Sequence, residues 1–170
     1  MTADEIRNAI QSASDYLTEH PEEARATDSA ATATLAGGLV VHVAGPNGAM
    51  LRTDMVPSVG GTETAPSPGW LLRAAEASCV ATLIAMRAAT LGIALDDLEV
   101  VVDSESDDRG LLGIADVPAG PLSGRVRVRV TAAGVDAGTL EEIAHWGVKH
   151  CPVCDAVERP VPITIEVSVG

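Results

Sequence analysis

The chain has 170 residues, of which 46% are hydrophobic, 21% charged and only 2% aromatic. This length suits one domain with or without a short extension, and the apolar fraction excludes disorder along the whole chain. Its 11 basic and 24 acidic residues give a net charge of -13, which repels phosphate backbones and anionic membrane surfaces. We therefore expect no nucleic acid and no membrane among the partners.

The first part of the chain, residues 1–29, is predicted to be a helix and a linker outside the main domain, which spans residues 30–170. Thr2 and Glu5 have the spacing of a capping box. Apolar residues then recur at helical intervals until His20, where a following proline ends the helix. The polar residues after it, which include no bulky side chains, are typical of a linker.

Three short strands are predicted next, at residues 32–35, 39–44 and 49–56. The second and third are separated by a Gly-Pro-Asn-Gly sequence, whose Asn-Gly pair is a strong hairpin signal. Residues 57–67 are rich in glycine, proline, serine and threonine, and we expect a loop there.

A long helix is predicted from Pro68 to Leu91. Ser67 before the proline is an N-cap, and Gly92 is a stop signal. The charged residues fall on one side of this helix: Arg73, Glu76 and Arg87. Because the remaining positions are aliphatic, we expect an almost wholly buried core helix. Such a helix needs cover on several sides in so small a chain, which favours a dimer.

The C-terminal half adds strands at residues 98–102 and 125–131, a helix at 139–150, a short helical turn at 152–158 and a last strand at 163–169. In the second of these strands, valines alternate with the residues of a solvent-exposed basic face: Arg125, Arg127 and Arg129. The acidic stretch between the two strands is expected to be a solvated connection. Strands paired as hairpins on both sides of a long helix predict an α+β fold.

Three cysteines are too few for the disulfide scaffold of a secreted protein. The N-terminal sequence also lacks the positive charge and apolar run of a signal peptide. A cytoplasmic location is therefore expected, where thiols stay reduced. Cys79, three turns into the long helix, is either a small buried hydrophobe or a nucleophilic thiolate.

Cys151 and Cys154 form a C-x-x-C sequence near the C-terminus. If Pro152 starts a short helix, Cys151 is its N-cap, where the helix dipole favours a thiolate. The pair alone indicates a redox dithiol or half of a zinc site. No histidine or third cysteine supplies a second close pair with zinc spacing, so no metal is expected.

Three stretches occur in an order that resembles a known family. They are Pro68-Gly69-Trp70-Leu71-Leu72 with the following Ala77-Ser78-Cys79, Leu91-Gly92-Ile93 with a strand after it, and Lys149-His150-Cys151-Pro152-Val153. The first is similar to a Pro-Glu-x-Leu helix that reaches an Ala-x-Cys sequence, and the last to a second cysteine motif. Together they resemble the OsmC/Ohr family, the osmotically inducible and organic hydroperoxide resistance proteins, over about residues 30–170.

The resemblance implies an OsmC-like fold, with antiparallel sheets wrapped around a long buried central helix in an intertwined homodimer. It also implies that a Cys79 thiolate attacks an organic hydroperoxide, becomes a sulfenic acid and releases an alcohol. Cys151 would then form a disulfide with Cys79, and an external dithiol of the lipoyl type would reduce it. No cofactor is implied.

Gly69 departs from the family pattern, because hydroperoxide-reducing members have a glutamate directly after the proline that opens the helix. The supporting residues expected here are Glu63 in the preceding loop and Arg52 near the early strands. Glu76 is expected to point elsewhere. Cys154 is an additional thiol that offers an alternative resolving partner.

Two other functions stay open at this point. One is a catalytically weak dimeric stress protein that binds a small hydrophobic ligand at the subunit interface. The other is a thiol-exchange or metal-binding module that uses the C-x-x-C sequence.

Overall fold

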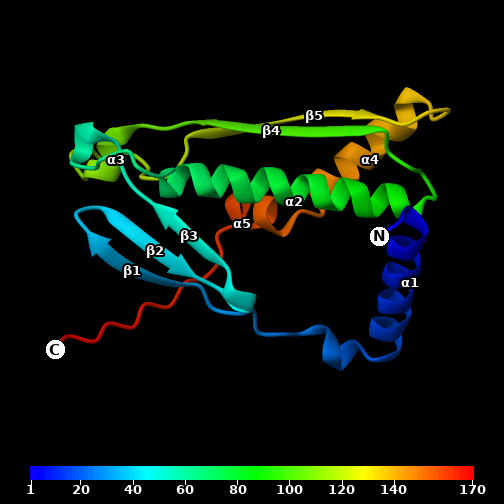
Figure 1. Cartoon of the computed structure of the whole chain (residues 1–170), viewed down its shortest axis with the longest axis horizontal. Helices are drawn as coiled ribbons and strands as arrows, with labels where there is room; N and C mark the ends of the chain where they lie inside the picture. The colour runs from blue at the N-terminus through cyan, green and yellow to red at the C-terminus, as the bar shows by residue number, and fades with distance from the viewer. The chain divides into compact units, whose positions relative to one another are not determined.

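The computed structural model describes all residues from Met1 to Gly170, and these form two compact units. One unit is Asn8–Ala75, and the other is Met1–Arg7 together with Glu76–Gly170. Figure 1 shows helices and strands in both, and every strand pair is antiparallel. The α+β architecture predicted from the sequence is therefore confirmed.

Helix α1 (Ala3–Glu19) begins with the predicted capping box. The Thr2 hydroxyl accepts a hydrogen bond from the Glu5 N–H at 3.2 Å, and the Glu5 carboxylate accepts one from the Thr2 N–H at 2.7 Å. The helix ends before His20, and a short 3-10 helix, η1 (Pro21–Ala24), follows. Both ends thus lie where the capping and proline signals place them.

The first sheet contains β1 (Thr32–Gly37), β2 (Val40–Ala44) and β3 (Met50–Thr53) in sequence order. The reversal between β2 and β3 includes the 3-10 turn η2 (Pro46–Gly48), in which Asn47 takes a left-handed φ of 54°. This is the asparagine of the predicted Asn-Gly signal. Strand β3 is shorter than predicted, and the loop after it includes η3 (Pro57–Val59).

Helix α2 (Pro68–Thr90) has the predicted bounds to within one residue and is followed by Gly92 at a φ of 73°. Its long apolar sequence would suffice to cross a membrane by length and composition, a property shared with core helices of globular proteins. The expectation of nearly complete burial is wrong for the single chain. Only one face is buried, because this chain covers only that face: Val80, Ile84, Ala88 and Ala89.

A two-stranded hairpin, β4 (Asp97–Glu105) and β5 (Ser123–Thr131), runs along the part of α2 that belongs to the same unit (Figure 1). A short helix, α3 (Asp108–Leu112), lies in the connection. Val100 pairs with Val128 in the register, so that alternate valines face the core.

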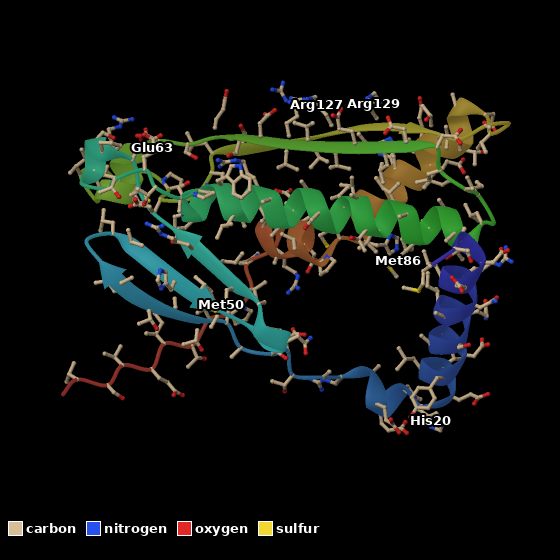
Figure 2. All side chains as sticks on the ribbon, in the orientation of Figure 1. His20, Met50, Glu63, Met86, Arg127 and Arg129 are labelled. Atoms are coloured by element: carbon tan, nitrogen blue, oxygen red, sulfur yellow. The ribbon has the colours of Figure 1, made fainter.

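The arginines of β5 form the exposed face that the alternation predicts. Figure 2 shows Arg127 and Arg129 pointing from β5 away from α2. Arg125 and Arg127 both form ion pairs with Asp103, and Arg129 pairs with Asp97. Asp103 therefore belongs to β4 and not to a solvated loop as expected, because the antiparallel register sets it opposite the arginines.

Two further helices complete the second unit, α4 (Ala137–Lys149) and α5 (Pro152–Glu158). The Asp136 carboxylate caps α4 by accepting the Thr139 N–H at 3.0 Å. The buried cluster of this unit joins residues of α2, α4 and the start of α5: Val80, Ile84, Ala88, Ile143, Cys151 and Cys154. Two of the three cysteines are thus part of the core.

The strand predicted at residues 163–169 does not form in the single chain. Its apolar side chains are almost fully exposed, from 79% for Val167 to 93% for Val169. A strand exists only where a neighbouring strand accepts and donates its backbone hydrogen bonds. The alternation of apolar and polar residues that predicted a strand is present, but no strand of this chain pairs with the segment.

Gly147 of α4 provides a test of this packing. A Cβ added there would lie 2.5 Å from Cγ1 of Ile84 and 3.0 Å from its backbone nitrogen. We expect Gly147→Ala to lower the free energy of unfolding in urea by about 1–3 kcal/mol, because overpacking outweighs the gain in helix propensity. The control is Gly69→Ala in α2, where the nearest atoms are 3.9 Å away. Equal stability of the two variants would contradict the packing described.

Candidate active site

The three cysteines meet at the contact between α2 and the start of α5. Cys79 lies on α2, Cys151 directly precedes α5, and Cys154 lies in its first turn. All three are free thiols. Cys151 and Cys154 are 1% and 4% exposed, whereas Cys79 is partly exposed. The sequence-predicted pair, Cys79 and Cys151, is therefore brought together, and the additional thiol joins it.

Cys151 is the centre of this cluster because it caps α5. Pro152 occupies the first position of the helix, so Cys151 before it is the N-cap residue. The side chain of an N-cap residue can accept a hydrogen bond from an N–H of the first helical turn. The Cys151 sulfur accepts the Cys154 N–H at 3.3 Å. Cys79 packs against the buried cluster that contains both Cys151 and Cys154.

The hydrogen bonds separate the acidities of the three thiols. Burial alone would raise the pKa of Cys151, but the N–H and thiol donors of Cys154 and the Cys79 thiol outweigh it and lower that pKa. For Cys79 and Cys154, burial raises the pKa, and the neighbouring Cys151 raises it further; the Glu76 carboxylate adds to the rise at Cys154. The first negative charge of the cluster therefore lies on Cys151, with a proton retained on each neighbour.

Glu76 of α2 reaches the cluster from the other side. Its Oε1 accepts a hydrogen bond from the Cys154 thiol at 3.6 Å, a distance suited to sulfur. The expectation that Glu76 points elsewhere is therefore wrong. The signal that could have found it is its position three residues before Cys79, since such residues share a helix face.

A cavity of about 600 Å³ opens beside Glu76 and Cys154. Valines of β5 and α4 line part of it, and neither Cys79 nor Cys151 belongs to its lining. The acidic and titratable residues of the wall besides Glu76 are Glu141, His145 and Glu158. Cys154 is thus the thiol of the cluster that this cavity meets.

The side chains of His150 and Arg87 both contact Trp146. The His150 ring stacks on the indole with 4.0 Å between centroids, and its Nδ1 lies 2.8 Å from the Trp146 carbonyl oxygen. The Arg87 guanidinium lies 5.2 Å from the same indole. The lowering of the Cys151 pKa has hydrogen bonds as its cause.

Arg52 and Glu63, the other two predicted site residues, belong to the unit of residues 8–75. Arg52 donates to the Thr64 hydroxyl at 2.7 Å, while Glu63 is exposed with a left-handed φ of 52°. The loop that carries them is organised by Asp54, which is 1% exposed. The three cysteines lie in the other unit.

Asp54 is a structural residue that sequence reasoning missed. Its carboxylate accepts hydrogen bonds from the hydroxyls and N–H groups of both Thr62 and Thr64, as well as from the Met55 N–H. These donors, the Thr62 hydroxyl first, hold the pKa of Asp54 well below its usual range. The Thr-x-Thr sequence after an aspartate was the available signal.

Comparison with known proteins identifies the family of this chain. The family model described as OsmC-like protein matches residues 61–166, which include all three cysteines. The chain belongs to the OsmC-like protein family. A comparison with curated proteins finds no matching sequence.

Solved structures of OsmC-like and Ohr proteins share the fold at low sequence identity. An organic hydroperoxide resistance protein OsmC from Legionella pneumophila is 21% identical, with 78% of this chain and 90% of that chain covered and a TM-score of 0.56. The organic hydroperoxide resistance protein OhrB of Bacillus subtilis is 20% identical, with coverage of 79% and 93% and a TM-score of 0.52. An OsmC-like protein from Mycoplasma pneumoniae is 15% identical, with coverage of 79% and 89% and a TM-score of 0.66.

The acidity of the thiols gives a direct test of the cluster. We expect one thiol to have a pKa below the usual value of about 8.5 and two to have a pKa above it. The ultraviolet absorbance of the thiolates, recorded as a function of pH, measures these titrations. Cys151→Ser removes the low-pH step. Cys79→Ala and Cys154→Ala each raise its midpoint, because each removes a thiol that favours the Cys151 thiolate. A low-pH step that survives Cys151→Ser would contradict this assignment.

Proposed function

We propose that this OsmC-like protein is a thiol-dependent peroxidase that reduces organic hydroperoxides through a cycle of Cys79 and Cys151. The observation that carries the proposal is the packing of the partly exposed Cys79 against the buried cluster that contains Cys151. A sulfenic acid formed at Cys79 has its resolving thiol already in contact. The solved relatives named for organic hydroperoxide resistance support the same substrate class.

Exposure assigns the attacking role to Cys79. It is the partly exposed member of the pair, whereas Cys151 is 1% exposed. The raised pKa of Cys79, due to burial and to its donation to Cys151, keeps this thiol protonated. A protonated thiol is a poor nucleophile, so Cys79 must lose its proton as its sulfur attacks. The Cys151 thiolate accepts this proton, and Cys151 therefore acts first as a base.

The first half of the cycle balances on these two residues. The Cys79 sulfur attacks the distal oxygen of ROOH, the O–O bond breaks, and the alkoxide takes a proton to leave as ROH. The Cys151 sulfur then attacks the Cys79 sulfenic acid, forming the disulfide and releasing the hydroxyl as water. Two electrons have passed from the thiols to the peroxide. No cofactor takes part.

A dithiol reductant, of the lipoyl type or similar, completes the proposed cycle by thiol–disulfide exchange. This cycle fits the cytoplasm, because that compartment keeps thiols reduced between turnovers. The departure at Gly69 is accommodated by the same geometry. The hydrogen-bonded Cys151 thiolate supplies the base next to Cys79.

Single-turnover oxidation tests this function. With one equivalent of tert-butyl hydroperoxide, we expect the wild type to release one equivalent of alcohol and form the Cys79–Cys151 bond first. Cys79→Ser releases no alcohol, because the attacking sulfur is missing. Cys151→Ser accumulates a sulfenic acid that dimedone labels and mass spectrometry locates.

The matched control is Thr82→Ser, which changes an exposed residue one turn further along α2 whose hydroxyl binds only its own helix. It should oxidise at the wild-type rate. Retention of all three thiols in the wild type would overturn the peroxidase proposal. Retained thiols with a co-purified apolar molecule would instead support the ligand-binding alternative.

We propose in addition that the functional form is a homodimer with α2 as its central helix. Two surfaces of the single chain support this. Most of α2 outside one face is unburied, and the last residues expose Ile163, Ile165 and Val167 on one side of a strand-like alternation. A second copy that pairs with this segment and covers α2 would bury both kinds of apolar surface.

The terminal alternation provides a test of the dimer. Ile165→Asp should raise the dimer dissociation constant at least about tenfold, because a carboxylate would enter the newly buried face. Glu166→Gln, which alters the neighbouring polar side, should leave it unchanged. Sedimentation equilibrium measures both. A monomeric wild type, or equal dissociation constants for the two variants, would contradict the proposed interface.

A further inference from the structure

Cys154 and Glu76 have no part in the two-cysteine cycle, yet both contact it. We propose that Cys154 is a third redox thiol, which converts the Cys79–Cys151 disulfide into a Cys151–Cys154 disulfide beside the cavity, where the dithiol reductant meets it. Glu76 accepts the Cys154 proton in this exchange. The inference rests on the proposed function for the formation of the first disulfide.

The position of Cys151 between the other two thiols is the first argument. Cys151 and Cys154 belong to one buried cluster and Cys79 packs against it, so Cys151 has both other cysteines as neighbours. Cys151 at the N-cap and Cys154 in the first turn of α5 also have the C-x-x-C spacing of redox dithiols. The 3.3 Å contact of the Cys154 N–H with the Cys151 sulfur places this sulfur over the turn that carries Cys154.

Proton transfer is the second argument. Cys154 is nine-tenths or more buried, and a thiol in that position is a poor nucleophile until it loses its proton. The Glu76 carboxylate lies 3.6 Å from the Cys154 sulfur and accepts that proton's hydrogen bond. A base in direct contact with the thiol is the arrangement that an attack by Cys154 requires.

The cavity would also give an external dithiol access to a Cys151–Cys154 disulfide. The cavity of about 600 Å³ is lined by Cys154 and Glu76 but by neither Cys79 nor Cys151. Cys151 is 1% exposed, so a disulfide between Cys79 and Cys151 offers an external dithiol no approach to the Cys151 sulfur. Transfer to Cys154 moves the reducible bond to the wall of a space large enough for a small dithiol.

The exchange balances without a further oxidant or reductant. The Cys154 sulfur attacks the Cys151 sulfur, its proton passes to Glu76, and the Cys79–Cys151 bond breaks as the Cys151–Cys154 bond forms. Cys79 leaves as a thiolate and takes a proton from solvent. Glu76 releases to solvent the proton that it took from Cys154. Cys79 is thereby reduced and ready for another hydroperoxide, and the external dithiol later reduces the Cys151–Cys154 bond.

A time-resolved disulfide map tests the relay. The reduced full chain is mixed with one equivalent of tert-butyl hydroperoxide, quenched with acid and alkylating agent at successive times, and mapped without reduction. We expect the Cys79–Cys151 bond to appear first and to decay into Cys151–Cys154. In Cys154→Ser the first bond should persist, and Cys154→Ala serves as a second variant should the serine disturb the core.

Glu76→Gln should slow the conversion roughly a hundredfold, because the base is lost, while the first bond forms at the wild-type rate. Glu141→Gln is the matched control, since it removes a carboxylate from the same cavity wall without touching a thiol. Equal conversion rates in these two variants would remove Glu76 from the step.

The outcomes separate this inference from the function it rests on. A Cys79–Cys151 bond that persists in the wild type overturns the relay and leaves the peroxidase intact. Absence of any Cys79 oxidation, in the wild type and in Cys154→Ser alike, overturns the peroxidase itself. Formation of Cys151–Cys154 at an unchanged rate in Cys79→Ser would also overturn the relay, because the bond would then not pass through Cys79.

Discussion

The chemistry of this chain depends on one helix cap. Proline can begin α5 because the first position of a helix needs no N–H, and the residue before it must then supply the capping acceptor. Here that residue is Cys151, and its sulfur takes the Cys154 N–H. A buried thiolate would ordinarily be strongly disfavoured. The cap is what makes Cys151, the most enclosed of the three, the thiol whose pKa is lowered.

The cap acts on Cys79 only because the helices are close. Gly147 lets α4 approach α2 at Ile84, with no room for even a Cβ. Ile143, Ile84 and Val80 are nearly inaccessible and join the two cysteines of α5 in one buried cluster. Such tightly packed interiors hold side chains in fixed positions. The separation of the three thiol acidities is therefore a property of the packed core as much as of the thiols.

Local signals predicted most of the fold. The capping box at Thr2, the Asn-Gly reversal and the Ser67-Pro68 start each depend on neighbouring residues, and each is present. The features that depend on distant residues were predicted incorrectly. Asp103 forms ion pairs within a strand pair, α2 is buried on only one face, and residues 163–169 form no strand. In the site, the resemblance to the OsmC/Ohr family identified Cys79 and Cys151. It could not find the contact of Glu76 with Cys154, because that contact joins residues 78 positions apart in the chain.

The different acidities of the three thiols also determine which group accepts a proton at each step of the proposed cycle. Burial and the neighbouring Cys151 raise the pKa of both Cys79 and Cys154, so Cys151 is the partner common to both. A thiol that leaves or attacks does so as a thiolate, and each outer thiol needs a separate proton acceptor. In the proposed cycle that acceptor is Cys151 itself for Cys79, and for Cys154 it is Glu76, whose carboxylate contacts this thiol. Oxidation from the Cys79 side and reduction from the cavity side can then use different acceptors, which keeps the two halves of the proposed cycle from competing for one proton.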